Sequence, residues 1–254
     1  YFIGKFIGPI FRSKSLIIEN LKQANINNEK NFDDISLSVL GNYGRIFSEY
    51  VHIKNFRNGK LNRFIEIEGK EYLKDIIENN KKVVFISGHF NNFELMAMQL
   101  EKLGVDLAAI YRPLNNKYLN KDMEFIRKNF ICKNQIKKGR SGSRELIKNF
   151  KNGSSIALMI DQRVREGINV PFFKKFASTT TIPAQLVNKY NCEIVPIYIE
   201  RKKEVFFKMY ISKPLNFEKN NSIESITLEL NQILERMILK NIDQWIWTHN
   251  RWKK

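Results

Sequence analysis

The chain has 254 residues, which is enough for one large α/β domain or two small ones, and its hydrophobic fraction of 43% suits a globular protein with a core. Its 43 Lys and Arg residues against 26 Asp and Glu residues give a formal net charge of +17. This charge predicts an acidic partner, such as nucleic acid, an anionic membrane surface or an acidic carrier protein. A codon bias toward Lys, Asn and Ile is a second explanation for part of the charge. Cys132 and Cys192 stand too far apart for a metal-ligand pair and argue against a disulfide framework, and no segment approaches the roughly 20 consecutive apolar residues of a membrane-spanning helix.

The first part of the chain predicts helices followed by an exposed strand. Residues 1–11, YFIGKFIGPIF, are apolar and aromatic, and they fit either a short element that packs on the domain or a stretch that lies among lipid head groups. Apolar residues at helical spacing predict helices over residues 13–25 and 33–51, which we interpret as a structural lid over a sheet. Residues 64–69 alternate like an exposed strand, and a short helix is expected over residues 71–80.

A histidine follows the first buried strand. Residues 83–86, VVFI, predict that strand, and His89 stands on the turn into a helix that carries Glu94. Open α/β sheets bind ligands at the carboxyl ends of their strands, where this turn would lie. A glutamate in the first helical turns can hold one ring nitrogen of His89 as N–H and leave the other as a general base toward a substrate hydroxyl. The alternative is a capping histidine beside a solvated glutamate.

The next strand and helix carry two arginines. A strand is predicted over residues 107–111, followed by Arg112 and Asn115 at the edge where the histidine is expected. Arg112 is either a receptor for a phosphate or carboxylate or an ordinary loop residue. The helix predicted over residues 117–130 carries Arg127, which its own pattern does not distinguish from a solvated helix charge.

A basic stretch and an acidic strand end come next. Residues 137–144, KKGRSGSR, precede a helix and combine Arg140 and Arg144 with glycines and serines. This pattern fits either a phosphate cradle at a helix N-terminus or a solvated run of charge. A buried strand then ends at Asp161 and Gln162, and its position predicts that the carboxylate faces the same cleft as the histidine.

The last part of the chain predicts a loop, two strands and an amphipathic helix. An apolar loop is expected at residues 170–173, strands over residues 194–199 and 205–211, the second at a sheet edge, and a helix over residues 223–240. The tail from residue 245 to 254 holds all three tryptophans among cations. It fits either a membrane-interface segment or a helix end packed on the core, and its histidine is not assigned a catalytic role.

Five motifs in order resemble one known family over nearly the whole chain. They are GHFNNFE at residues 88–94, YRP at 111–113 with Asn115, Asp161-Gln162, VPFF at 170–173 with Ala177 and Thr179, and QWIWTH at 244–249 with Arg251-Trp252. The first resembles the His-x4-acidic signature of the glycerolipid acyltransferase superfamily. The whole set resembles, more narrowly, the late acyltransferases of lipid A biosynthesis. Related sequences carry a glycine at Lys174 or Lys175, so the local loop geometry is expected to differ here.

The resemblance implies a fold and a reaction. The expected fold is a single three-layer α/β acyltransferase domain over residues 1–254, with a central mixed, mostly parallel sheet flanked by helices, as in glycerolipid acyltransferases. The expected reaction moves a fatty acyl chain from an acyl carrier protein thioester to a hydroxyl of a lipid A precursor, with the carrier protein as co-substrate and without a metal or cofactor. Family members usually begin with a hydrophobic anchor helix, so residues 1–11 are expected to be the interfacial remnant of such an anchor. The protein would act as a monomer on the cytoplasmic face of the bacterial inner membrane, either peripheral or anchored.

The resemblance also implies roles for individual residues. His89 and Glu94 would form the general-base pair, Arg127 would stabilise the oxyanion, and Asp161 would line the site without replacing Glu94. The expected substrate-binding residues are Arg112, Asn115, Arg140, Arg144 and Gln162.

Two other functions stay open. The nearer is an acyltransferase of the same superfamily that acts on lysophosphatidate or a phosphoinositide mannoside, although a clear Pro-Glu-Gly phosphate motif is absent from the sequence. The farther is a basic nucleic-acid-binding protein, whose binding would fall steeply with salt. The basic residues are scattered along the chain rather than gathered on one recognition helix, so no nucleic-acid partner is expected.

Overall fold

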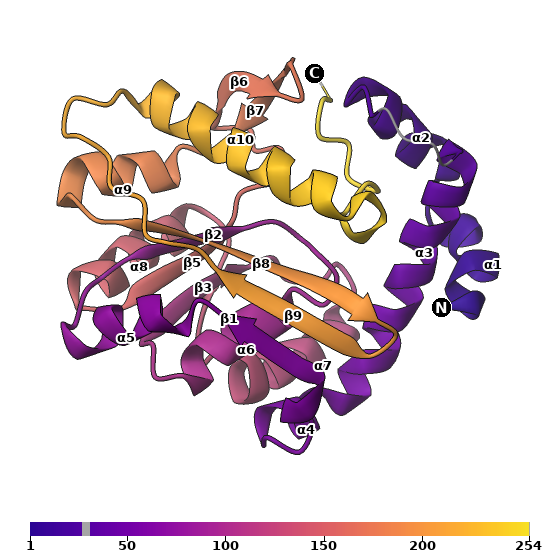
Figure 1. The fold of residues 1–254 in the computed structure, drawn as a ribbon, viewed down its shortest axis with the longest axis horizontal. Helices are drawn as coiled ribbons and strands as arrows, with labels where there is room; N and C mark the ends of the chain where they lie inside the picture. Colours follow the sequence, from indigo (N-terminus) through magenta and orange to yellow (C-terminus); the bar gives the residue numbers. More distant parts are fainter. Residues whose placement is uncertain (27–30, 254) are drawn as a thin grey trace.

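A mixed sheet runs through the middle of the molecule. The computed structural model describes residues 1–26 and 31–253, and within them the seven strands follow the order β1-β9-β8-β2-β5-β3-β4 (Figure 1). The strands are β1 (Ile65–Glu68), β2 (Val84–Ser87), β3 (Leu107–Tyr111), β4 (Asn134–Lys137), β5 (Ser155–Met159), β8 (Ile194–Lys203) and β9 (Phe206–Ile211). Every neighbouring pair is parallel except β8 and β9. This confirms the predicted mixed, mostly parallel sheet flanked by helices.

Helices cover both faces of this sheet, with α10 on one side and α6 on the other (Figure 1). The α-helices are α1 (Phe2–Phe11), α2 (Lys14–Gln23), α3 (Phe32–Glu49), α4 (Ile53–Arg57), α5 (Lys70–Glu78), α6 (Glu94–Lys102), α7 (Lys117–Ile126), α8 (Arg140–Lys151), α9 (Ile182–Tyr190) and α10 (Ile223–Lys240). Short 3-10 turns occupy Tyr50–His52, Asn62–Phe64 and Ile242–Gln244, and a π-helical turn, Arg127–Ile131, continues α7.

Two local predictions differ from the structure. The strand expected at the sheet edge, β9, lies inside the sheet because β1 adds parallel to its outer side. The loop expected at residues 170–173 belongs to a hairpin of β6 (Ile168–Phe172) and β7 (Lys175–Thr179). Its turn residues Phe173 and Lys174 both have positive φ, +51° and +62°, which is the conformation that a glycine tolerates best.

The central strands fix the position of the histidine turn. Strand β2 is buried at every residue between β5 and β8, so the hydrophobic effect holds it firmly in the sheet. The parallel register pairs Ser87 with Met159. Because His89 and Asp161 each stand two residues beyond this pair, both emerge at the carboxyl edge of the sheet, side by side.

The N-terminal helix α1 packs on α3 at close range. A Cβ atom on Gly4 would stand 2.6 Å from the backbone oxygen of Leu40 and 3.1 Å from the Cα of Gly44, so only glycine permits this contact. In Figure 1, α1 and α3 stand at the end of the sheet toward which β8 points. None of the helices within residues 1–26 and 31–253 combines the length and the apolar character that crossing a membrane requires.

Candidate active site

His89 and Asp161 form a hydrogen-bonded pair at the carboxyl edge of the sheet. The ring Nδ1 lies 2.8 Å from Oδ1 of Asp161, and the backbone N–H of His89 donates to Oδ2 over 2.7 Å. The indole N–H of Trp245 also donates to Oδ2, over 2.8 Å. Asp161 is fully buried, and burial alone would raise its pKa, but the charge of His89 and these hydrogen bonds lower the pKa below its usual value.

The state of Asp161 determines the tautomer of His89. Because the lowered pKa keeps Asp161 ionised, its carboxylate accepts, and Nδ1 of His89 must carry the hydrogen. The side chain of His89 is 19% exposed, and Nε2 makes no hydrogen bond to any residue that the structure describes. The ring of Phe93 meets the imidazole edge to face at 4.6 Å and limits its rotation. In the neutral form of the imidazole, this arrangement leaves Nε2 as the nitrogen without a hydrogen, available to an incoming hydroxyl.

Glu94 does not make the contact that the sequence predicted. Its Oε1 accepts from the hydroxyl of Tyr50 at 2.8 Å and from Nε and Nη2 of Arg127 at 2.8 and 2.6 Å. Among the described residues, the carboxylate that contacts the ring of His89 is Asp161, so the expected His89–Glu94 contact was wrong. The physical reason is that Glu94 is the first residue of α6, where its carboxylate contacts Arg127. Asp161 follows β5, which lies directly beside β2, and therefore reaches the histidine.

Arg127 is the first residue of the π-helical turn after α7, and its guanidinium forms an ion pair with Glu94. Its side chain is 13% exposed, and burial would lower its pKa, but the charge of Glu94 raises it instead. Its guanidinium lies 5.7 Å from the ring centre of Tyr111. Two of the three guanidinium nitrogens thus hold a carboxylate in place, and Nη1 remains for another partner.

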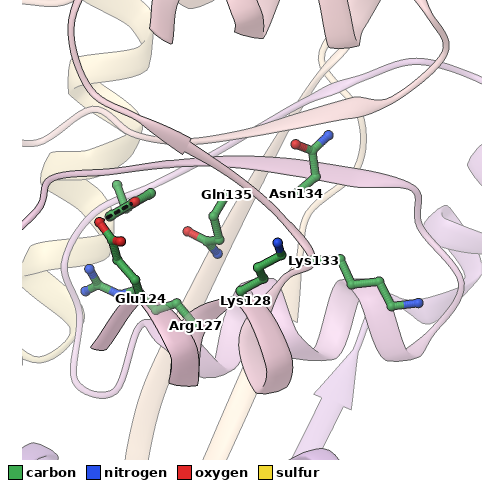
Figure 2. A pocket seen from close by; sticks show the side chains of 7 residues that line it. Glu124, Arg127, Lys128, Lys133, Asn134 and Gln135 are labelled. Carbon is green, nitrogen blue, oxygen red and sulfur yellow. Dashed lines mark hydrogen bonds between the residues drawn. The ribbon is translucent and has the colours of Figure 1, made fainter. Parts of the chain in front are cut away.

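A pocket of about 280 Å³ lies beside this ion pair, between the end of α7 and strands β3 and β4 (Figure 2). Its lining residues are Tyr111, Glu124, Arg127, Lys128, Lys133, Asn134 and Gln135. Glu124 accepts hydrogen bonds from Tyr111 and Asn120 and pairs with Lys137 at 3.1 Å, and these donors lower its pKa to about 2. The lining therefore combines the cations Arg127, Lys128 and Lys133 with one ionised carboxylate, that of Glu124.

The predicted substrate-binding residues are not gathered around the pair. Arg112, Asn115 and Arg144 are exposed, and none of them shares a hydrogen bond or ion pair with His89 or Asp161 among the described residues. Gln162 follows Asp161 directly and is half-buried. Arg140 opens α8, but its side chain lies outside the described part of the chain, so its predicted role stays a prediction together with the others.

The tail contributes residues to the site that local patterns did not predict. Trp245 and Trp247 are buried, so the tail packs on the core, as one of the two interpretations predicted. Phe90 and Trp245 form an antiparallel bridge, and the N–H of Asn91 donates to the backbone oxygen of Gln244 over 3.0 Å. These contacts fasten the histidine turn to the tail. A family motif at residues 244–249 was the one signal that could have pointed to Trp245.

A second histidine lies near the pair without touching it. Nε2 of His249 accepts from the backbone N–H of Arg163 over 3.0 Å, and burial lowers the pKa of this imidazole. His249 is therefore neutral at ordinary pH and serves as an acceptor that fixes the loop after β5.

Comparisons with known proteins agree with the resemblance noted in the sequence. Residues 3–254 match the family model described as bacterial lipid A biosynthesis acyltransferase. The chain is 28% identical over 204 residues to a lipid A biosynthesis acyltransferase of Haemophilus influenzae, covering 77% of this chain and 63% of that protein. It is 24% identical over 200 residues to the lipid A biosynthesis lauroyltransferase of Escherichia coli, covering 76% and 63%.

A solved structure is similar in outline. The crystal structure of the 1-acyl-sn-glycerophosphate acyltransferase from Thermotoga maritima aligns with 98% of this chain and 94% of its own, at 15% identity and a TM-score of 0.46. The chain spans about 63% of the length of the two curated relatives named above. Because the family model covers nearly every residue, the chain belongs to the bacterial lipid A biosynthesis acyltransferase family.

Proposed function

We propose that the protein transfers a fatty acyl chain from an acyl carrier protein thioester to a hydroxyl group of a lipid A precursor. The observation that carries this proposal is the His89–Asp161 pair, which presents a free Nε2 at the carboxyl edge of the sheet in a chain of this family. No side-chain nucleophile is needed if the acceptor supplies the attacking oxygen.

The proposed chemistry uses His89 twice. Nε2 removes the proton of the acceptor hydroxyl while that oxygen attacks the carbonyl carbon of the thioester, which forms a C–O bond and places negative charge on the carbonyl oxygen. The tetrahedral intermediate then collapses, the C–S bond breaks, and the imidazolium returns its proton to the thiolate. Asp161 stabilises the imidazolium between these steps because it remains ionised.

The Tyr50–Glu94–Arg127 cluster has a supporting role in this proposal. Glu94 is the first residue of α6, which directly follows the histidine turn, so its three hydrogen bonds fix where that turn ends. The oxyanion is stabilised by backbone N–H groups or by Nη1 of Arg127, and one such donor is commonly worth about 3 kcal/mol. Arg112, Asn115, Arg140, Arg144 and Gln162 remain candidates for the acceptor's polar groups.

The substrates account for the charge and the exposed N-terminal helix. Helix α1 exposes Phe2, Phe6 and Phe11 by 73–80%, with Lys5 and Arg12 beside them, a combination suited to the interface of an anionic membrane. The acyl carrier protein and the phosphorylated glycolipid are both acidic, which suits a chain of charge +17. We further propose that the protein acts at the cytoplasmic face of the inner membrane.

A mass-shift assay tests the proposal. The protein is incubated in detergent with a lipid A precursor and a set of acyl carrier protein thioesters, and the product is weighed. We expect a gain of one acyl chain that is lost in a folded His89→Ala variant, with circular dichroism as the control for folding. No gain with any thioester contradicts the function, and retained turnover in His89→Ala contradicts the mechanism.

A further inference from the structure

Helix α7 exposes apolar side chains and buries none of its residues, although it leads directly into the turn that carries Arg127. Tyr118, Leu119 and Phe125 are 85%, 59% and 62% exposed. Tyr118 and Phe125 stand seven residues apart, so they share one side of the helix. Single exposed apolar residues need no explanation, but two large aromatics along one helix face suggest contact with an apolar phase.

Lysines border this apolar side. Lys117, Lys121 and Lys128 follow one another at intervals of four and seven residues, which places them along one adjacent side of α7 and its continuation. All three are exposed, and Asp122 is the exposed acid near them. The carboxylate of Glu124, which lines the neighbouring pocket, is offset by its ion pair with Lys137. An aromatic face bordered by lysines is typical of helices that lie at the surface of an anionic membrane.

The pocket of about 280 Å³, here called the basic pocket, lies where α7 continues into the π-helical turn, and Lys128 belongs to its lining (Figure 2). Arg127 is paired with Glu94, which leaves the ammonium groups of Lys128 and Lys133 without an ion pair among the described residues. The side-chain amide of Gln135 adds a donor to the lining. At about 280 Å³ the cavity is close to the lower end of the range of roughly 300–1,000 Å³ for small-molecule sites. Its size and charge suit one phosphate group rather than an extended polyanion.

We propose that α7 and the basic pocket together bind an anionic lipid, with its phosphate head group between Lys128 and Lys133 and its hydrocarbon against Tyr118 and Phe125. A lipid fits better than an acidic protein because the cations adjoin both an exposed aromatic face and a pocket of head-group size. The inference rests on the proposed function only in that it takes the membrane as the place where the acceptor is found. It adds a second membrane contact to the one proposed for α1.

Vesicle sedimentation tests the site without relying on turnover. The full chain is mixed with vesicles of phosphatidylcholine and phosphatidylglycerol, or of phosphatidylcholine alone. We expect the Lys128→Ala/Lys133→Ala variant to bind the anionic vesicles about 30-fold more weakly, because each lysine near such a surface contributes about fivefold. Lys128→Arg, which keeps the charge, should bind like the wild type. Tyr118→Asn/Phe125→Asn should lose about tenfold or more.

Matched controls separate the site from bulk charge and bulk apolarity. Lys213→Ala/Lys219→Ala removes the same charge from exposed positions elsewhere. Phe176→Asn and Leu239→Asn remove apolar side chains that are 71% and 53% exposed on β7 and α10, which lie on the opposite side of the sheet from α7 (Figure 1). Each control should change vesicle binding less than twofold.

Several outcomes would overturn the proposal. Wild-type binding by the double-lysine variant would do so, as would an equal loss in the Lys213→Ala/Lys219→Ala control. If the variants bind vesicles normally but lose binding to acyl carrier protein, the surface receives a protein. If light scattering shows a dimer that Tyr118→Asn/Phe125→Asn dissociates, the face is covered by a second copy. If soluble glycerol 1-phosphate binds as tightly as the lipid, the pocket is a free-phosphate site. A failed acyl-transfer assay touches none of these binding results.

Discussion

Replacing Asp161 with asparagine tests the hydrogen-bond network around the histidine. The Oδ2 side of Asp161 accepts two N–H groups, from the backbone of His89 and from Trp245, whereas Oδ1 accepts one, from the ring. An asparagine therefore keeps its carbonyl oxygen toward the two N–H donors and turns its NH₂ group toward Nδ1. That nitrogen must then accept, the ring hydrogen moves to Nε2, and His89 no longer acts as a base at that atom.

The expected loss is large. In Ser–His–Asp hydrolases the corresponding substitution lowers kcat about 10⁴-fold, or about 5.5 kcal/mol, for the same tautomeric reason. We expect a loss of about this size in single-turnover acyl transfer by Asp161→Asn, with circular dichroism showing that the fold is kept. A loss of less than about tenfold would refute the assignment of Asp161 as the partner of His89.

Glu94→Gln is the matched comparison. Glutamine can still accept from Tyr50 and Arg127, but it leaves the nearly buried guanidinium without a counter-charge, which costs about 3 kcal/mol and roughly 6–12 °C in Tm. Because Glu94 does not touch the ring, we expect its effect on kcat to be about tenfold. If Glu94→Gln abolishes turnover with an unchanged Tm, Glu94 acts on the chemistry and the structural reasoning fails.

Three further predictions follow from other contacts. Trp245→Phe removes one hydrogen-bond donor from Asp161, so kcat should fall about tenfold. The acid limb of the pH profile of kcat/KM should also move to higher pH. An acid limb at the wild-type pH would contradict this prediction. Gly69→Ala places a Cβ atom 2.0 Å from a backbone oxygen of β9 at φ +83°, so urea unfolding should show a free energy of unfolding lower by about 3 kcal/mol. Gly104→Ala also stands at positive φ, but its nearest contact is 3.7 Å away, so it should lower this free energy by only about 1 kcal/mol. Equal losses in the two variants would refute the clash. Burial lowers the pKa of His249, so the stability that the neutral imidazole contributes is complete at pH values above its usual pKa of 6.5 and is lost as pH falls through the lower folded pKa. The Tm of the wild type should therefore fall more than the Tm of His249→Gln between neutral and mildly acid pH. Parallel falls in the two Tm values would exclude the effect.

The buried strands and long helices could be predicted because their patterns are strong. The VVFI run predicted β2, and helical spacing predicted α3 and α10 within a few residues. Strand β4, with the sequence NQIK, carries no such pattern and depends on pairing with β3. The β6–β7 hairpin was hidden by a proline and by a turn without glycine.

The candidate site was predicted in part. The strand-end rule placed both His89 and Asp161 at one edge, but the partner of the histidine was chosen by sequence proximity, which favoured Glu94. The actual partner depends on β5 lying directly beside β2, and that order is a property of the whole sheet rather than of any local spacing. Tyr50 carried no signal at all, since its role appears only when the turn after α3 meets α6.

The charge of Asp161 also explains a buried cation in the tail. Arg251 is fully buried, donates to the backbone oxygen of Ser178 at 2.7 Å and to Oγ1 of Thr179 at 2.6 Å, and lies over the ring of Phe172. All these partners are neutral, and burial lowers the pKa of Arg251 to about 10, so it stays charged at neutral pH. A buried charge needs compensation, and the negative charge that acts on Arg251 is that of Asp161. One ionised carboxylate therefore orients the histidine, accepts the hydrogen bond of the indole and supplies the negative charge that acts on the buried cation of the tail.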